Sequence, residues 1–110
     1  MDTLNILRNA VQHILIECAE YGKPPEGMKF ETVFDTENDH YLWLILGWDG
    51  NRRIYNCLIH LDIIDEQIWV QQNNTEFTLI EDFERFGISK YNIVNGMIHA
   101  NRRRMLENVV

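Results

Sequence analysis

The stretch DHYLWLILGWDGNRRIYNCLIHLDIIDEQIWVQQ, residues 39–72, decides the fold. Most of its residues are apolar, β-branched or aromatic, which are the types that strands prefer. Short polar connections divide it at residues 49–51 (DGN) and 65–66 (DE). Asp-Gly between apolar runs is a strong hairpin signal, because glycine tolerates the positive φ of such turns. The stretch therefore predicts three successive antiparallel strands, over residues 40–48, 52–64 and 67–72.

The flanking segments extend this core into an α+β domain. Apolar residues recur every three or four positions from Leu4 to Tyr21, which predicts an amphipathic helix over residues 3–21. Strict alternation predicts a half-buried strand over residues 28–35. A second helix is expected over residues 76–86, with Thr75 as its N-cap. We therefore expect an N-terminal helix, a four-stranded antiparallel meander and a C-terminal helix or helices, packed on one sheet face.

Length and composition favour one ordinary globular domain over residues 1–110. Hydrophobic residues make up 45% of the chain and charged residues 25%, which is typical of soluble proteins. No apolar run reaches the roughly 18 residues that span a bilayer, and the first residues do not resemble a signal peptide. We therefore expect a cytoplasmic protein that has no membrane partner.

The charge is distributed unevenly along the chain. Residues 1–89 hold six basic and sixteen acidic side chains, whereas residues 90–110 hold four and one, and the net charge is −7. Proteins that bind the phosphate backbone need a concentrated basic surface. The composition therefore argues against direct high-affinity nucleic-acid binding. The basic run Arg102-Arg103-Arg104 leaves weak DNA binding as an alternative.

One constellation of polar residues lies within the predicted strands. His60 and Asp62 are two residues apart on one strand and share a face, and His40 begins the neighbouring strand. They could form a metal site, a small-ligand pocket or an acid–base pair, but zinc needs three or four convergent ligands. A histidine hydrogen-bonded to a carboxylate is the favoured interpretation. No phosphate loop, nucleophile elbow or HExxH motif is found, so we assign no catalytic, cofactor-binding or metal-binding residue and expect no enzymatic activity.

The sheet face away from the helices is expected to be apolar and to need a cover. Monomers rarely expose large apolar patches, and aromatic residues are enriched at interface centres. We expect a second copy or a partner protein to cover this face. The candidate contact residues are Trp43, Trp48, Trp69, Arg102, Arg103 and Arg104.

Blocks of sequence spread over nearly the whole chain resemble the XisI proteins, small cyanobacterial proteins named as control factors for excision of the fdxN DNA element. The blocks are residues 34–41 (FDTENDHY), 47–49 (GWD), 52–57 (RRIYNC), 60–63 (HLDI), 68–76 (IWVQQNNTE), 86–90 (FGISK) and 92–94 (NIV). The chain departs from the family pattern at the second turn, where Asp65-Glu66 replaces Asp-Gly. It departs again at Gly96-Met97, where the family tends to have Gly-Phe followed by proline.

The resemblance implies an XisI-like fold and a non-enzymatic accessory role in DNA element excision. Family members look like proteins encoded beside XisH, a protein with a nuclease-like fold. The resemblance therefore implies contact with an XisH-like partner, and it carries over no catalytic residues.

Overall fold

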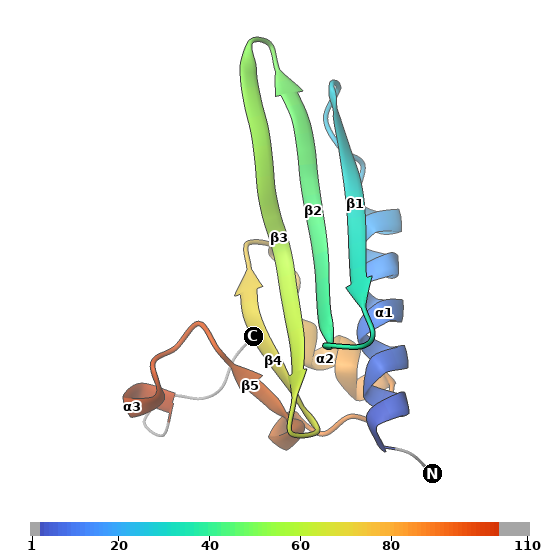
Figure 1. The fold of residues 1–110 in the computed structure, drawn as a ribbon, viewed down its shortest axis with the longest axis vertical. Coiled ribbons are helices and arrows are strands. Elements are labelled where there is room, and N and C mark those ends of the chain that lie inside the picture. The colour runs from blue at the N-terminus through green and yellow to red at the C-terminus, as the bar shows by residue number, and fades with distance from the viewer. Residues whose placement is uncertain (1–2, 104–110) are drawn as a thin grey trace.

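A five-stranded sheet forms the centre of the structure, a computed structural model that describes residues 3–103 (Figure 1). The elements in chain order are α1 (Thr3–Tyr21), β1 (Met28–Asp35), β2 (His40–Asp49), β3 (Arg52–Ile64), β4 (Gln67–Asn73), α2 (Leu79–Arg85), the 3-10 turn η1 (Lys90–Asn92), β5 (Ile93–Asn95) and α3 (Ala100–Arg103). No helix within the described residues is long and apolar enough to cross a membrane.

The strands follow chain order across the sheet. The first four strands form the predicted antiparallel meander, so the α+β fold class is confirmed. The fifth strand was not predicted, and it pairs with β4 in parallel. A parallel pair needs a crossover connection, and here α2 and η1 provide it. A three-residue strand is too short to leave a periodic pattern in the sequence.

The β2–β3 and β3–β4 connections are two-residue turns of the kind that match strand twist. Gly50 has φ 61° at the first position of the β2–β3 turn, as its sequence predicted. In the β3–β4 turn Asp65 and Glu66 have φ 51° and 59°. Glutamate has a Cβ that is disfavoured in this left-handed region, so the departure from Asp-Gly leaves conformational strain in the chain.

Replacing Glu66 with glycine should relieve this strain. We expect Glu66→Gly to raise the free energy of unfolding by about 0.5–1 kcal/mol, since the relief outweighs the added flexibility of the unfolded chain. Urea denaturation measures the change. Glu66→Ala removes the same charge but keeps the Cβ, so it should show no gain, and equal stabilisation by both variants would contradict the interpretation.

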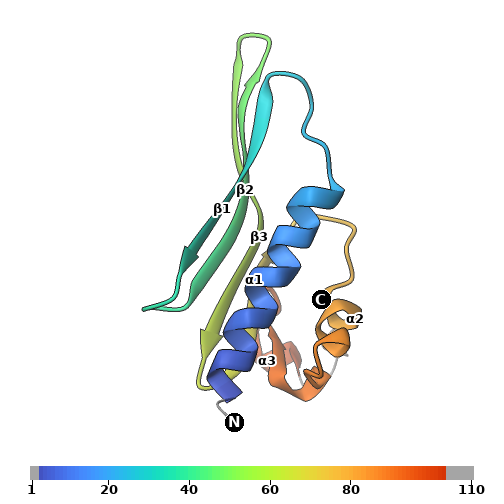
Figure 2. The same cartoon turned by 90° about the vertical axis from the view of Figure 1, so that its right-hand side faces the viewer.

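Helix α1 covers one face of the sheet, together with α2 (Figures 1 and 2). Its apolar stripe packs against side chains of β2 and β3 in a single buried cluster. The largest fully buried side chains from these three elements are Leu7, Val11, Ile14, Leu15, Tyr41, Ile59 and Leu61. Cys18 belongs to the same cluster, and burial raises the pKa of its thiol to about 11. Both helices therefore lie on the same sheet face, as predicted.

The second helix is shorter than predicted, and Thr75 is not its N-cap. Helix α2 begins at Leu79, and Thr78 occupies the N-cap position without a side-chain hydrogen bond. Thr75 instead donates its hydroxyl to Asn73 Oδ1, and Phe77 N donates to Thr75 Oγ1. These local bonds hold the segment before Leu79 in a turn, because short polar side chains compete with helical hydrogen bonding.

A salt bridge between Arg8 and Asp39, which we call the lock, links α1 to the β1–β2 turn. Arg8 donates Nε and Nη2 to the two carboxylate oxygens of Asp39, at 2.8 and 3.1 Å. The buried Tyr41 hydroxyl donates to Asp39 Oδ1 at 2.8 Å. The bonds from Arg8 and Tyr41 outweigh the opposing effect of burial and lower the pKa of Asp39. The ionised carboxylate therefore stabilises the folded state.

We expect Asp39→Asn to lower the free energy of unfolding by about 1–3 kcal/mol at pH 7, the range for a hydrogen-bonded charge. Asparagine tolerates the φ of 58° found here, so the change isolates the charge. Because the folded-state pKa is lowered, the contribution is present above the unfolded pKa of about 3.9 and is lost as the pH falls below it.

Denaturation of both proteins at pH 7 and at pH values below 4 measures this effect, and the gap between them should narrow in acid. Asp49→Asn is the control, since Asp49 forms an exposed pair with Arg52 and such pairs contribute little. A gap of the same size at every pH would contradict the assignment.

Candidate functional site

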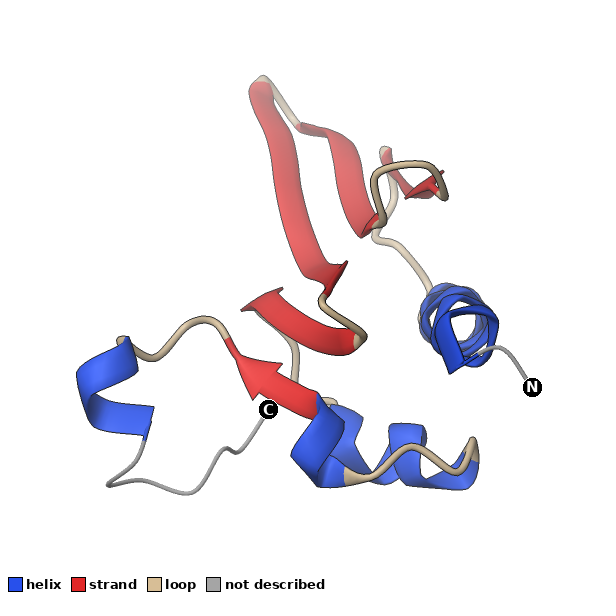
Figure 3. Ribbon diagram, turned by 60° about the horizontal axis from the view of Figure 1, so that its bottom comes forward, coloured by secondary structure: helices blue, strands red, loops and turns tan. Residues whose placement is uncertain are grey.

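Neither α1 nor α2 covers the sheet face opposite the core, and we call this face the open face. Alternation along β2 places His40 and Trp48 here, because Tyr41 and Trp43 face α1. The strand register then identifies their neighbours on the other strands. The apolar members of the open face include Val33, Leu42, Leu44, Leu46, Trp48, Tyr55 and Trp69. Figure 3 shows α3 beyond β5, away from α1 and α2.

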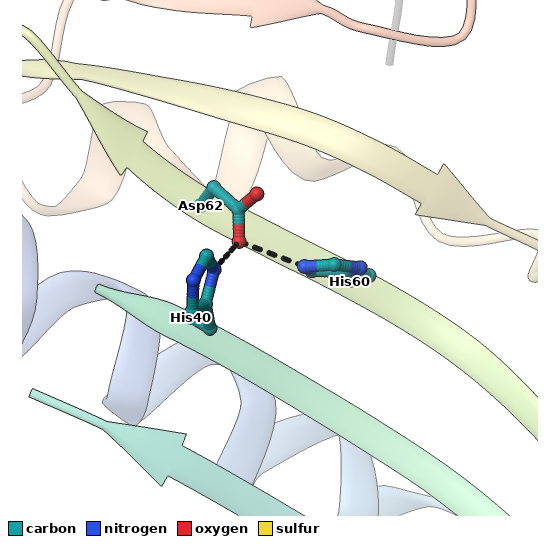
Figure 4. A group of neighbouring side chains, drawn as sticks. All are labelled: His40, His60 and Asp62. Atoms are coloured by element: carbon teal, nitrogen blue, oxygen red, sulfur yellow. Dashed lines mark hydrogen bonds and ion pairs between the residues drawn. The ribbon is translucent and has the colours of Figure 1, made fainter. Parts of the chain in front are cut away.

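Three polar side chains meet at the end of the open face nearest the β1–β2 turn, which we call its lower end. Figure 4 shows them. His40 lies directly opposite Asp62 on the neighbouring strand, and His60 lies two residues before Asp62. His40 Nδ1 and His60 Nε2 both lie 2.7 Å from Asp62 Oδ1. The structure therefore brings together all three residues of the constellation that the sequence identified.

A fourth side chain completes the surroundings of Asp62. The register of β3 and β4 shifts between His60 and Leu61, and such a bulge re-aims side chains. Gln71 Nε2 donates to Asp62 Oδ2 at 3.1 Å, so both oxygens of the carboxylate are hydrogen-bonded. Sequence analysis missed Gln71, because the bulge that brings its side chain to Asp62 leaves no mark on the pattern of apolar residues.

Burial and hydrogen bonding act in opposite directions on Asp62, which is only 7% exposed. Burial raises its pKa, but the bonds from His40, His60 and Gln71 outweigh burial and hold the pKa below its usual value. The hydrogen bond and the charge of Asp62 raise the pKa of His40. The cluster therefore holds a carboxylate that stays ionised although almost all of its surface is buried.

The raised pKa of His40 depends on the carboxylate of Asp62. In protein treated with a chelator, the ring-proton shifts of His40 should titrate above the ordinary midpoint of about 6.5. Asp62→Asn removes the negative charge and should move this midpoint down. NMR titration of the histidine rings measures both values. An unchanged His40 midpoint in Asp62→Asn would contradict this account.

Two of the three predicted contact tryptophans lie on the open face, and one does not. Trp48 is 51% exposed, and Trp69 is half-buried opposite Asp62. Trp43 is wrong as a contact residue, since it is 3% exposed and packs under α1 with its ring centroid 5.0 Å from that of Phe30. Alternation with Trp48 explains this, because residues 43 and 48 are an odd number of positions apart on one strand.

Each tryptophan of the open face carries an arginine over its ring. Arg53 Cζ lies 5.5 Å from the Trp48 ring centroid, and Arg103 Cζ lies 5.1 Å from that of Trp69. Arg102 is exposed on α3, and Arg104 lies outside the described residues. Sequence analysis missed Arg53, although a two-residue turn at 50–51 pairs it with Trp48.

A hollow lies between α1 and the segment around α2, away from the open face. Its carboxylates include Glu17 and Asp82. Arg85 already binds both, at 2.7 and 3.2 Å. These two acidic groups are thus held within the protein, and the open face is the stronger candidate site.

The fold and the open face define a class of small α+β domains in which helices cover one side of a meander sheet. A family model described as XisI protein matches residues 1–110. The chain therefore belongs to the XisI family, and the fold expected from the resemblance is confirmed.

Two solved structures from Anabaena variabilis ATCC 29413 are similar to this chain. An XisI-like protein is 33% identical with a TM-score of 0.88, and the match covers 97% of this chain and 98% of that one. The fdxN element excision controlling factor XisI is 27% identical with a TM-score of 0.83, covering 93% and 99%. No curated protein matches the sequence.

Proposed function

We propose that this chain is a non-enzymatic accessory factor of the XisI type, which controls excision of a DNA element in the cytoplasm by contacting another protein. The family membership supports the link to excision, since one similar structure is described as an fdxN element excision controlling factor. The open face, with its two tryptophan–arginine pairs, is the main observation in support of a mechanism by protein–protein contact.

The composition of the open face suits a protein interface. Tryptophan, tyrosine and arginine are enriched among residues that dominate binding energy. Here Trp48 and Tyr55 are 51% and 63% exposed, and Val33, which lies farther along the open face opposite Leu42, is 46% exposed. Rings that arginines already hold in place lose little freedom on binding, so contact with them costs less entropy.

The charge pattern favours a protein partner over DNA. Acidic side chains on α1, α2 and the turns account for most of the net charge of −7, which repels a phosphate backbone. The cations of the open face are few, and Arg53 and Arg103 lie over aromatic rings. We propose an XisH-like protein as the partner, whose matching surface supplies apolar groups and hydrogen-bond acceptors.

Trp48→Ala and Trp69→Ala should each weaken association with a purified XisH-like protein encoded beside this chain by at least about tenfold, since a buried aromatic anchor contributes at least 1–2 kcal/mol. Titration calorimetry measures the affinity, and circular dichroism checks the fold. Tyr21→Ala is the control, because Tyr21 is 83% exposed on α1, away from the open face.

Light scattering after size-exclusion chromatography gives the composition of the complex. A mixed complex with unchanged affinity in both tryptophan variants would overturn the open face as the contact surface. A homodimer that binds no XisH-like protein would overturn the proposed partner and assign the open face to a second copy. Salt-sensitive duplex binding would instead favour direct DNA contact through the arginines of α3.

A further inference from the structure

We propose that His40, His60 and Asp62 form a binding site for a divalent first-row transition metal ion of the zinc type. Residue spacing alone gives only a loose set of donors and favours a hydrogen-bonded histidine. The folded geometry favours a metal site, since the three side chains point at one position on the open face (Figure 4).

The distances fit a single ion. One donor atom from each of the three residues lies within 4.8 Å of the other two. Zinc–ligand bonds of 2.0–2.2 Å place neighbouring tetrahedral ligands about 3.3 Å apart. The histidine nitrogens already lie 2.7 Å from Asp62 Oδ1. An ion that replaces these two hydrogen bonds therefore requires small side-chain rotations and no change in the strands.

The chemistry of the donors selects the class of ion. Two imidazole nitrogens and one carboxylate oxygen suit zinc and its first-row neighbours. Calcium takes six to eight oxygen ligands, and magnesium prefers carboxylates with several waters. The three-residue group contains a single carboxylate, Asp62. The neighbouring Asp35 pairs with His40 in the sheet, but its carboxylate accepts hydrogen bonds from Glu37 N and from Asn38 in its own turn. The site should therefore discriminate strongly against both of these ions.

The site is also built in advance of binding. Asp62 is 7% exposed and stands between two strands that fix its backbone. Gln71 holds Asp62 Oδ2, so Oδ1 is the oxygen turned toward the histidines. Metal sites commonly have such outer partners that orient a ligand. Gln71 is thus a positioning residue for the site.

The exposure of the ligands leaves the ion accessible from solvent. The His40 side chain is 51% exposed and that of His60 is 30% exposed. Three protein ligands leave a fourth position on a tetrahedral ion, which water or another donor fills. Trp69 pairs with Asp62 in the sheet, so the site lies beside a tryptophan of the open face. The ion would therefore lie within the surface that we propose for partner contact, although its binding does not depend on a partner.

The test is titration of the chelator-treated, isolated chain with Zn²⁺ in a non-coordinating buffer, followed by calorimetry. We expect one ion per chain, and we expect His40→Gln, His60→Gln and Asp62→Asn each to weaken binding at least tenfold. Gln71→Ala should weaken it by about tenfold, as loss of an outer partner does. Co²⁺ in place of Zn²⁺ reports the ligand geometry through its visible absorption.

Two matched controls remove the same kinds of side chain elsewhere. His13→Gln removes an exposed histidine on α1, and Asp49→Asn removes an exposed carboxylate at the β2–β3 turn. Both should bind Zn²⁺ as the parent does. Should Asp62→Asn fail to fold, the two histidine variants still decide the question, because His40 and His60 are not in the hydrophobic core.

Absence of stoichiometric binding would overturn the site and leave a hydrogen-bonded network only. Equal Zn²⁺ affinity in the His40→Gln/His60→Gln double variant would overturn it as well, as would equal affinity for Ca²⁺ or Mg²⁺. The proposed metal site and the proposed contact surface can be tested independently of each other. Trp48→Ala should lose partner affinity and keep the metal, since Trp48 lies at the opposite end of β2 from His40.

Discussion

The structure depends on the burial of one apolar helix stripe against one face of the sheet. Helix α1 places Leu7, Val11 and Ile14 over β2 and β3, and removal of this area from water is the main stabilising contribution. Side chains alternate along a strand, so the choice of covered face assigns every strand residue to the core or to the open face. The lock between Arg8 and Asp39 fixes where along the sheet the helix lies.

The same alternation explains why the polar cluster is where it is. Asp62 lies on the open face at the end of β3, between β2 and β4, where neighbouring strands bury most of its surface. A buried carboxylate is costly without partners. His40, His60 and Gln71 supply them from three strands. These donors satisfy the hydrogen-bonding requirement of the buried carboxylate. The two histidines and Asp62 also have the composition of a metal site.

Aromatic and polar features therefore share one surface. Trp69 pairs with Asp62 across β3 and β4, and Arg103 of α3 lies over the same tryptophan. Membership of the XisI family connects the chain with control of DNA element excision through its relatives. Contact by the open face and metal binding at its lower end are compatible, since both use side chains that the core does not need.

Local patterns in the sequence determined the first helix, the four-stranded meander, the β2–β3 and β3–β4 turns and the residues of the His40–Asp62–His60 constellation. Periodicity and turn chemistry are short-range properties. Tertiary structure alone decided the remainder. Strand β5 exists only by pairing with β4, Thr75 bonds to Asn73 and not to a helix end, and Trp43 is buried because α1 covers its face. The convergence of His40 and His60 on one oxygen likewise required the register between β2 and β3, and the contact of Gln71 with the same carboxylate required the bulge in β4. Register depends on contacts between residues far apart in the chain.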